Sequence, residues 1–183
     1  QAKHGELSEN DPVQETEEII VSTSTMSIGE WKKKMEISWF VQSFFCLKSA
    51  YFVCLFINLH LGQPILDFAQ FFTKRIRDHK KTSLPILLNE IIRLENFLDT
   101  FIEGDPHADF SDLDLLQVRW PIEEISFIKL SLQHELFYSE LRKVVNEFIV
   151  SKGLDCEPEL LNQVFDYQQS RIINPAGLSK KNL

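Results

Sequence analysis

Glycine and proline are scarce in this sequence, and so are the motifs that usually carry catalysis. Only six glycines and seven prolines occur among the 183 residues, so turns are few and long helices are favoured over many short strands. The glycines do not cluster, which argues against a phosphate-binding loop. No serine lies in a nucleophile-elbow pattern, so a hydrolase of that type is not indicated.

Metal-ligand patterns are also missing. The sequence contains no Cys-x-x-Cys pair, and its five histidines are scattered. His134 and Glu135 begin a zinc-protease pattern, but the second histidine would fall at position 138, which is Tyr138. The aspartates of residues 105–114 lack the spacing and the turn glycine of a calcium loop. We therefore assign no catalytic, cofactor-binding or metal-ligating residue to this chain.

The cysteines are three in number, and two of them, Cys46 and Cys54, lie in an apolar stretch. An odd count in apolar surroundings is typical of reduced, buried thiols in a cytoplasmic protein. Burial raises the pKa of a thiol, so we expect Cys46 and Cys54 to be inert core residues. The third, Cys156, lies about a hundred residues further along the chain.

The charge balance is acidic, with a formal net charge of -8. Phosphate binding needs clustered cations, so nucleic acid is not an expected partner. Cations do gather locally, at residues 32–34 and again at Lys74, Arg75, Arg77, Lys80 and Lys81. We expect these groups to form solvated helix faces and helix ends, as charge runs usually do.

Residues 39–61 form a strongly apolar run that is long enough to raise the question of a membrane span. Lys48 lies near its middle, and a central lysine costs roughly 2.5–3.5 kcal/mol on insertion scales. We therefore expect a pair of buried helices that breaks at Lys48 and Ser49. A protein that associates with membranes through this run remains an open alternative.

The pattern as a whole predicts an all-α fold, an irregular bundle of about six helices with an extended N-terminal arm. Residues 1–26 read as an acidic linker or arm, with six acids against one lysine in the first eighteen positions, and not as a signal peptide. Residues 27–171 form the helical domain. Residues 172–183 are expected to be a flexible tail.

Helix boundaries are indicated by capping residues. Ser27 and Glu30 have the spacing of a capping box before the apolar run, which Gly62 and Pro64 should end. Further helices are predicted over residues 65–79 and from Pro85 to residue 103, where Gly104 should stop the second. The longest helix should open at residues 120–121, with proline in its first turn, and end at Gly153. The last should start at residues 155–158.

Five polar residues of the predicted longest helix form a band, namely Gln133, His134, Glu135, Tyr138 and Glu140. We expect an exposed face with one or two buried polar contacts, because every amphipathic helix needs a polar side. The functional alternative is that some of these side chains face a neighbouring domain or a cofactor.

Several motifs resemble the helical region that follows the catalytic core of cobalamin (B12)-binding radical SAM enzymes. The stretch Glu-Thr-Glu-Glu-Ile-Ile-Val-Ser-Thr-Ser-Thr-Met-Ser at residues 15–27 is similar to the segment that leaves the barrel in that family. Similar motifs follow in the family's order: Trp31 with Ser-Trp-Phe-Val-Gln at 38–42, Trp-Pro-Ile-Glu-Glu at 120–124, Phe-Tyr-Ser-Glu-Leu at 137–141 and Tyr-Gln at 167–168. The match covers roughly residues 15–175.

These are structural signatures, and the family's Cys-x-x-x-Cys-x-x-Cys cluster motif is absent from the sequence. Lys48 and Ser49 also stand where a small residue such as glycine is expected at a bend. The resemblance therefore implies a C-terminal accessory domain, a fragment of a parent enzyme. That enzyme's upstream domains would bind a 4Fe-4S cluster, S-adenosylmethionine and cobalamin, and it would be a methyltransferase or a related radical enzyme. The helical region would pack on the barrel and help enclose the substrate.

Three hypotheses follow. The first is this accessory domain, whose partners are the upstream radical SAM and cobalamin-binding domains of the same parent chain. The second is a free-standing helical protein-interaction module with no catalytic activity. The third is the membrane-associated protein. We expect the first in the cytoplasm, with no cofactor bound by this chain alone.

Overall fold

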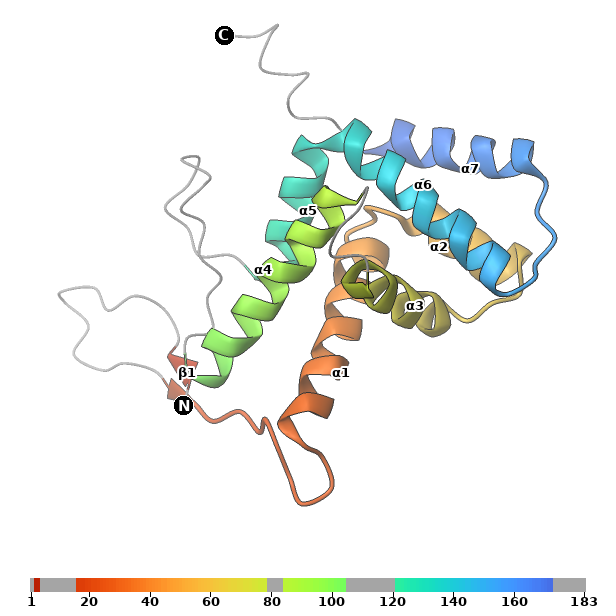
Figure 1. The fold of residues 1–183 in the computed structure, drawn as a ribbon. Helices are drawn as coiled ribbons and strands as arrows, with labels where there is room; N and C mark the ends of the chain where they lie inside the picture. The colour runs from red at the N-terminus through yellow and green to blue at the C-terminus, as the bar shows by residue number, and fades with distance from the viewer. Residues whose placement is uncertain (1, 4–15, 79–83, 105–120, 173–183) are drawn as a thin grey trace, which may run out of the picture.

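Helices make up almost all of the regular structure in the computed structural model, which describes residues 2–3, 16–78, 84–104 and 121–172. The helices of these ranges are α1 (Ile28–Phe40), α2 (Tyr51–Leu55), α3 (Ile65–Asp78), α4 (Pro85–Ile102), α5 (Ile122–Leu132), α6 (His134–Ser151) and α7 (Pro158–Arg171). The predicted all-α irregular bundle is confirmed. In Figure 1, α1 stands near the centre, with α4 and α5 on one side and α2, α3, α6 and α7 on the other.

The N-terminal arm contributes one short extended pair. Strand β1 (Ala2–Lys3) lies antiparallel to β2 (Thr16–Glu17). Regular helix begins only at α1, where the predicted capping box is present. The Glu30 backbone N–H donates to Ser27 Oγ over 3.3 Å, and the Ser27 N–H donates to Glu30 Oε2 over 2.7 Å. These two bonds satisfy donors that a helix start leaves unpaired.

Proline and glycine mark the other ends as predicted. Pro85 and Pro158 occupy the first turns of α4 and α7. Gly153 follows α6 with a φ of +62°, and the N–H of Leu154 donates to the carbonyl of Ile149 over 3.0 Å. This Schellman arrangement needs a left-handed residue, which glycine supplies without strain.

The apolar run breaks where it was predicted to break, at Lys48. Helix α1 continues into the π-helical segment η1 (Val41–Cys46), and α2 continues into η2 (Phe56–His60). The two halves are bent by 107°. Lys48 is exposed and has a φ of +69°, a left-handed conformation that costs a residue with a side chain roughly 1–2 kcal/mol.

Length and apolar composition allow no single helix of the described ranges to cross a membrane. The two halves of the bent pair, residues 28–46 and 51–60, pass that test only when taken together.

The prediction of one long helix from residue 120 to Gly153 is wrong, because the structure has two helices there. α5 ends and α6 begins around Gln133, whose φ of -108° and ψ of 33° are not helical. A continuous helix would have kept Leu136 in the buried stripe, but the break shifts the register. Leu136 is now 61% exposed, and its neighbours Phe137 and Tyr138 are buried. Pro121 precedes the first turn of α5 and does not lie within it.

Several predictions fall outside the described residues. They concern Trp120, Lys80 and Lys81, the acidic loop of residues 105–114 and the tail of residues 173–183.

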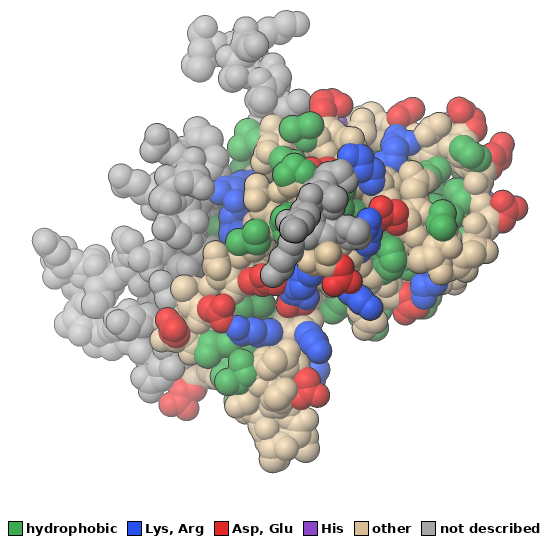
Figure 2. Space-filling model, in the orientation of Figure 1, with side chains coloured by type: hydrophobic (Ala, Val, Ile, Leu, Met, Phe, Trp, Pro, Cys, Tyr) green, Lys and Arg blue, Asp and Glu red, His purple; other side chains and the backbone are tan. Residues whose placement is uncertain are grey.

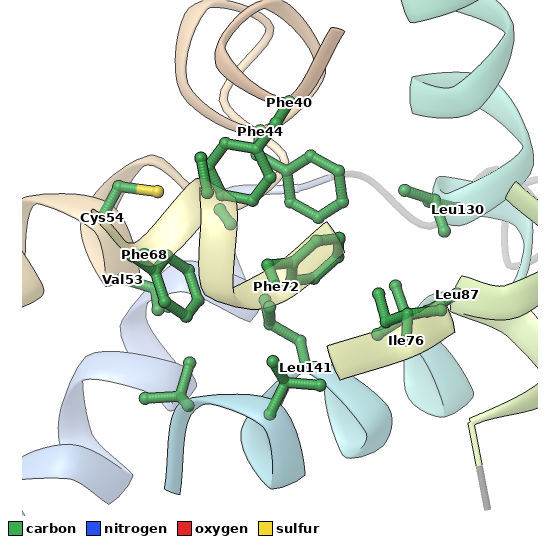
Figure 3. Close-up of a cluster of buried hydrophobic side chains, with 14 of the residues drawn as sticks. Phe40, Phe44, Val53, Cys54, Phe68, Phe72, Ile76, Leu87, Leu130 and Leu141 are labelled. Carbon is green, nitrogen blue, oxygen red and sulfur yellow. The ribbon is translucent and has the colours of Figure 1, made fainter. Parts of the chain in front are cut away.

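Phenylalanine rings fill the core (Figure 3). Phe40 and Phe44 stack with their centroids 4.8 Å apart, and both meet Phe72 of α3, at 5.1 and 4.9 Å. Phe44 also contacts Phe137 of α6. The aromatic cluster thus ties the first half of the apolar run to α3 and α6, which sets the positions of the surfaces described next.

Candidate docking surface

The predicted polar band is not an exposed face, and three of its five residues are interior. Tyr138, Glu140 and His134 are 0%, 5% and 7% exposed, and only Gln133 and Glu135 lie at the surface. The expectation of a solvated band with one or two buried contacts was wrong for most of these residues. Their partners explain the difference, because each buried side chain bonds to backbone groups of another element.

Glu140 of α6 caps the first turn of α4, which has no capping side chain of its own. Its carboxylate accepts from the backbone N–H of Ile86, over 3.1 Å, and of Leu87, over 2.9 Å. No side chain of α4 or its N-cap residue Leu84 makes that bond. The carboxylate also lies at the positive end of the α4 dipole, where an anion is favoured. Glu140 is therefore a structural tie between α6 and α4.

Tyr138 and Gln168 hold the bend around Lys48. The Tyr138 hydroxyl donates to the carbonyl of Ser49 over 2.7 Å, and Gln168 Nε2 donates to the carbonyl of Lys48 over 2.9 Å. Gln168 Oε1 accepts from the N–H of Phe52 over 2.8 Å. Burial raises the pKa of Tyr138 well above its usual range, and the bond from Gln168 opposes this only in part. These side chains satisfy backbone groups that the break would leave unpaired.

A groove of about 600 Å³ lies between α1 and α3. Cations and apolar side chains line it: Lys33, Lys34, Lys74, Arg77, Ile37 and Leu66 are among its residues, together with Glu36 and Asp78. Two cation groups that are separate in the sequence therefore meet across one groove. Figure 2 shows lysine and arginine side chains, with acidic ones between them, over the part of this face where α1 and α3 lie.

The charges of this groove are only partly neutralised. Arg77 forms ion pairs with Glu36 and, over 2.8 Å, with Glu95. Burial lowers the pKa of Arg77, but the hydrogen bonds and charges of these two carboxylates outweigh that and raise it overall. Lys33 and Lys74 are exposed, and neither is ion-paired or hydrogen-bonded to another described residue. The predicted solvated cations thus include two that are free to meet an acidic partner.

Leu66 gives the groove an apolar contact surface, since it is 50% exposed. Ile37, which is half-buried, also lines the groove. An apolar centre within a charged rim is the usual anatomy of a protein interface. Sequence reasoning missed this site because its two sides come from different helices, although the cation groups themselves were the available signal.

The three cysteines lie in different surroundings. Cys54 is fully buried, as predicted, and burial raises its pKa to about 12. Cys46 is exposed, so the prediction of a buried thiol there was wrong. It is the last residue of η1. Cys156 is half-buried, and burial is the main cause that raises its pKa.

Metal-ligand geometry does not occur among residues 2–3, 16–78, 84–104 and 121–172, where no group of three histidine, cysteine, aspartate or glutamate side chains is placed to hold an ion. A scan against models of known protein families finds no match for this chain. A search of curated proteins finds no similar sequence either.

Proposed function

We propose that this chain is an accessory helical domain of a larger enzyme, a cobalamin-dependent radical SAM methyltransferase or a related radical enzyme. Its role is to pack on the catalytic barrel and help enclose the substrate, because a radical intermediate must be protected from water and side reactions. The 4Fe-4S cluster, S-adenosylmethionine and cobalamin belong to upstream domains of that parent chain. The proposed location is the cytoplasm, which suits three free thiols.

The groove between α1 and α3 is the observation that carries this proposal. Unpaired Lys33 and Lys74 border the exposed Leu66, so the domain presents a ready contact surface for an acidic face of the barrel. The motifs that suggested the family support it in a second way. Trp39 donates to Ser126 Oγ over 2.9 Å, and Glu140 and Gln168 make the ties already described. Residues that hold helices together in this way suit a domain whose proposed role is to enclose the substrate and not to carry out the chemistry.

The first test is the reading frame upstream of Gln1. Three cysteines in the Cys-x-x-x-Cys-x-x-Cys spacing are expected there, and a frame without them would contradict the proposal. The longer protein, reconstituted anaerobically, should then form 5′-deoxyadenosine from S-adenosylmethionine. Residues 1–183 alone should bind no cluster, since Cys54 is enclosed in the core while Cys46 faces solvent. A stoichiometric cluster in the short chain would also refute the assignment.

Charge reversal tests the docking surface itself. In the parent protein, the double variant Lys33→Glu with Lys74→Glu should weaken the contact between this domain and the barrel. Amide exchange along α1 and α3 should then become faster, while the iron content of the protein stays unchanged. Both side chains are exposed, so folding should survive. Arg171→Glu is the matched control, because Arg171 is exposed at the end of α7 and is ion-paired to no other described residue. If the charge-reversed pair leaves amide exchange along α1 and α3 unchanged, the groove is not the contact with the barrel.

The alternative is the free-standing interaction module, which the same groove favours. On this account the acidic partner is a separate protein and the upstream frame holds no cluster cysteines. The charge-reversed pair should then abolish binding of that partner in trans.

A further inference from the structure

The length of the groove between α1 and α3 restricts what can dock in it. Glu36 of α1 forms an ion pair with Arg77 of α3. Phe40, one turn later in α1, meets Phe72, which comes earlier in α3, so the two helices run antiparallel. The α3 wall extends over residues 66–78, which is about 18 Å or three helical turns. The groove therefore suits an elongated segment of protein.

Charge is distributed unevenly along this groove. Its lining contains four cations, Lys33, Lys34, Lys74 and Arg77, against two acids, Glu36 and Asp78, within a chain whose formal net charge is -8. Both free lysines, Lys33 and Lys74, lie about one turn along their helices from the ion pair of Glu36 with Arg77. Leu66 lies about 12 Å before Lys74 along the axis of α3. The groove is thus apolar at one end and positive at the other, which favours an acidic partner.

The recurring modes of peptide recognition narrow the conformation of that partner. An extended strand needs an open sheet edge, but both walls of the groove are helices. A polyproline segment needs an aromatic-lined groove, and none of the described residues that line this one is aromatic. A phosphorylated motif is bound by clustered arginines, whereas Arg77 is the single arginine among those residues and already binds Glu36 and Glu95. The mode that remains is an amphipathic helix laid between two helices.

We propose that this groove binds an acidic amphipathic α-helix. One apolar side chain of that helix covers Leu66, which is 50% exposed. About two turns further along, a second apolar side chain contacts Ile37, and carboxylates beside it pair with Lys33 and Lys74. The inference rests on the docking role proposed for this groove, and it adds the conformation and the residue pattern of the segment that docks.

Titration of the 183-residue chain with a synthetic peptide, followed in amide proton–nitrogen spectra, tests the proposal. The probe is an alanine-based peptide with two leucines two helical turns apart and glutamates beside each leucine, a pattern that is alike in both chain directions. Shifts should appear at residues 33–37 and 66–78. Two matched peptides, one with lysines in place of the glutamates and one with a proline between the leucines, should each bind at least roughly tenfold more weakly.

Variants of the chain test the two ends of the groove separately. Leu66→Ala should weaken binding of the glutamate peptide about three- to tenfold, because it removes the apolar contact. Lys74→Gln should weaken it about two- to fivefold, the range of an exposed ion pair. Leu136→Ala, at a leucine of α6 that is 61% exposed, and Arg171→Gln are the matched controls and should keep the original affinity. Circular dichroism should be the same for all four variants, since each side chain is exposed.

Absence of shifts along α1 and α3, or unchanged affinity in Leu66→Ala, would overturn the site. Equal binding of the glutamate and lysine peptides would overturn the acidic partner, and equal binding of the proline peptide would overturn its helical conformation. These outcomes are separate from those of the proposed function. A parent protein that responds to charge reversal while the peptides fail would keep the docking role and lose the helix. Peptide binding by a chain whose upstream frame lacks cluster cysteines would keep the helix and lose the enzyme family.

Discussion

Replacement of Glu140 by alanine should be among the most damaging single changes in this protein. The carboxylate is buried and accepts from two backbone donors of α4, those of Ile86 and Leu87. Removing it leaves both N–H groups inside the protein without a partner, at about 1–3 kcal/mol each. It also removes an anion from a helix N-terminus, worth about 0.3–1 kcal/mol.

Together these losses are about 2–7 kcal/mol, a large share of the roughly 5–15 kcal/mol that stabilises a typical domain. Glu140→Gln keeps an acceptor oxygen and should lose about 1–2 kcal/mol. Urea unfolding followed by circular dichroism measures these differences. With a slope of about 2 kcal/mol/M, the alanine variant should lower the urea midpoint by roughly 1–3.5 M.

The control is Glu135→Ala on the same helix, an 80% exposed carboxylate whose loss should change the free energy of unfolding by less than about 0.5 kcal/mol. Amide exchange at Ile86 and Leu87 should also accelerate in Glu140→Ala. Equal, small losses in the Glu140→Ala and Glu135→Ala variants would refute the capping role and the reasoning built on it.

Three further outcomes are expected. Tyr138→Phe, which removes a 2.7 Å bond to a carbonyl of the bend, should lower the free energy of unfolding by about 1 kcal/mol, measured by urea unfolding, and no loss would contradict that role. Lys48→Gly should change thermal stability little or raise it, because relief of roughly 1–2 kcal/mol of left-handed strain is offset by about 0.5–1 kcal/mol of added chain entropy; a clear loss would argue against the strained conformation. With Ellman's reagent at pH 8, Cys46 should react first and Cys156 more slowly, while Cys54, whose pKa is raised to about 12, should react only on unfolding; early labelling of Cys54 would contradict its burial.

The sequence predicted the helix boundaries well, because their signals are local. Ser27 and Glu30 lie three positions apart, and Gly153 acts on the turn just before it. The bend at Lys48 was also predicted, since a charged and a polar residue interrupt an apolar run. The break at Gln133 has no such local mark, because it follows from which side chains α5 and α6 bury.

The polar interior could not be predicted for a related reason. Glu140 bonds to a residue 54 positions away, and Gln168 to one 120 positions away. Sequence spacing shows that a helix carries polar residues but not which distant backbone group each will meet. The same limit applies to the groove, whose Lys33 and Lys74 come from helices that only packing brings together.

The hydrogen bonds between Gln168 and the bend at Lys48 have a consequence for biosynthesis. Gln168 belongs to α7, the last helix of the described chain, yet it completes the hydrogen bonding of Lys48 and Phe52 near the start. During translation the apolar run therefore emerges long before the side chain that closes its bend. The nascent chain should remain protease-sensitive at residues 47–50 until α7 has left the ribosome, and a chaperone that covers aromatic segments would act in that interval.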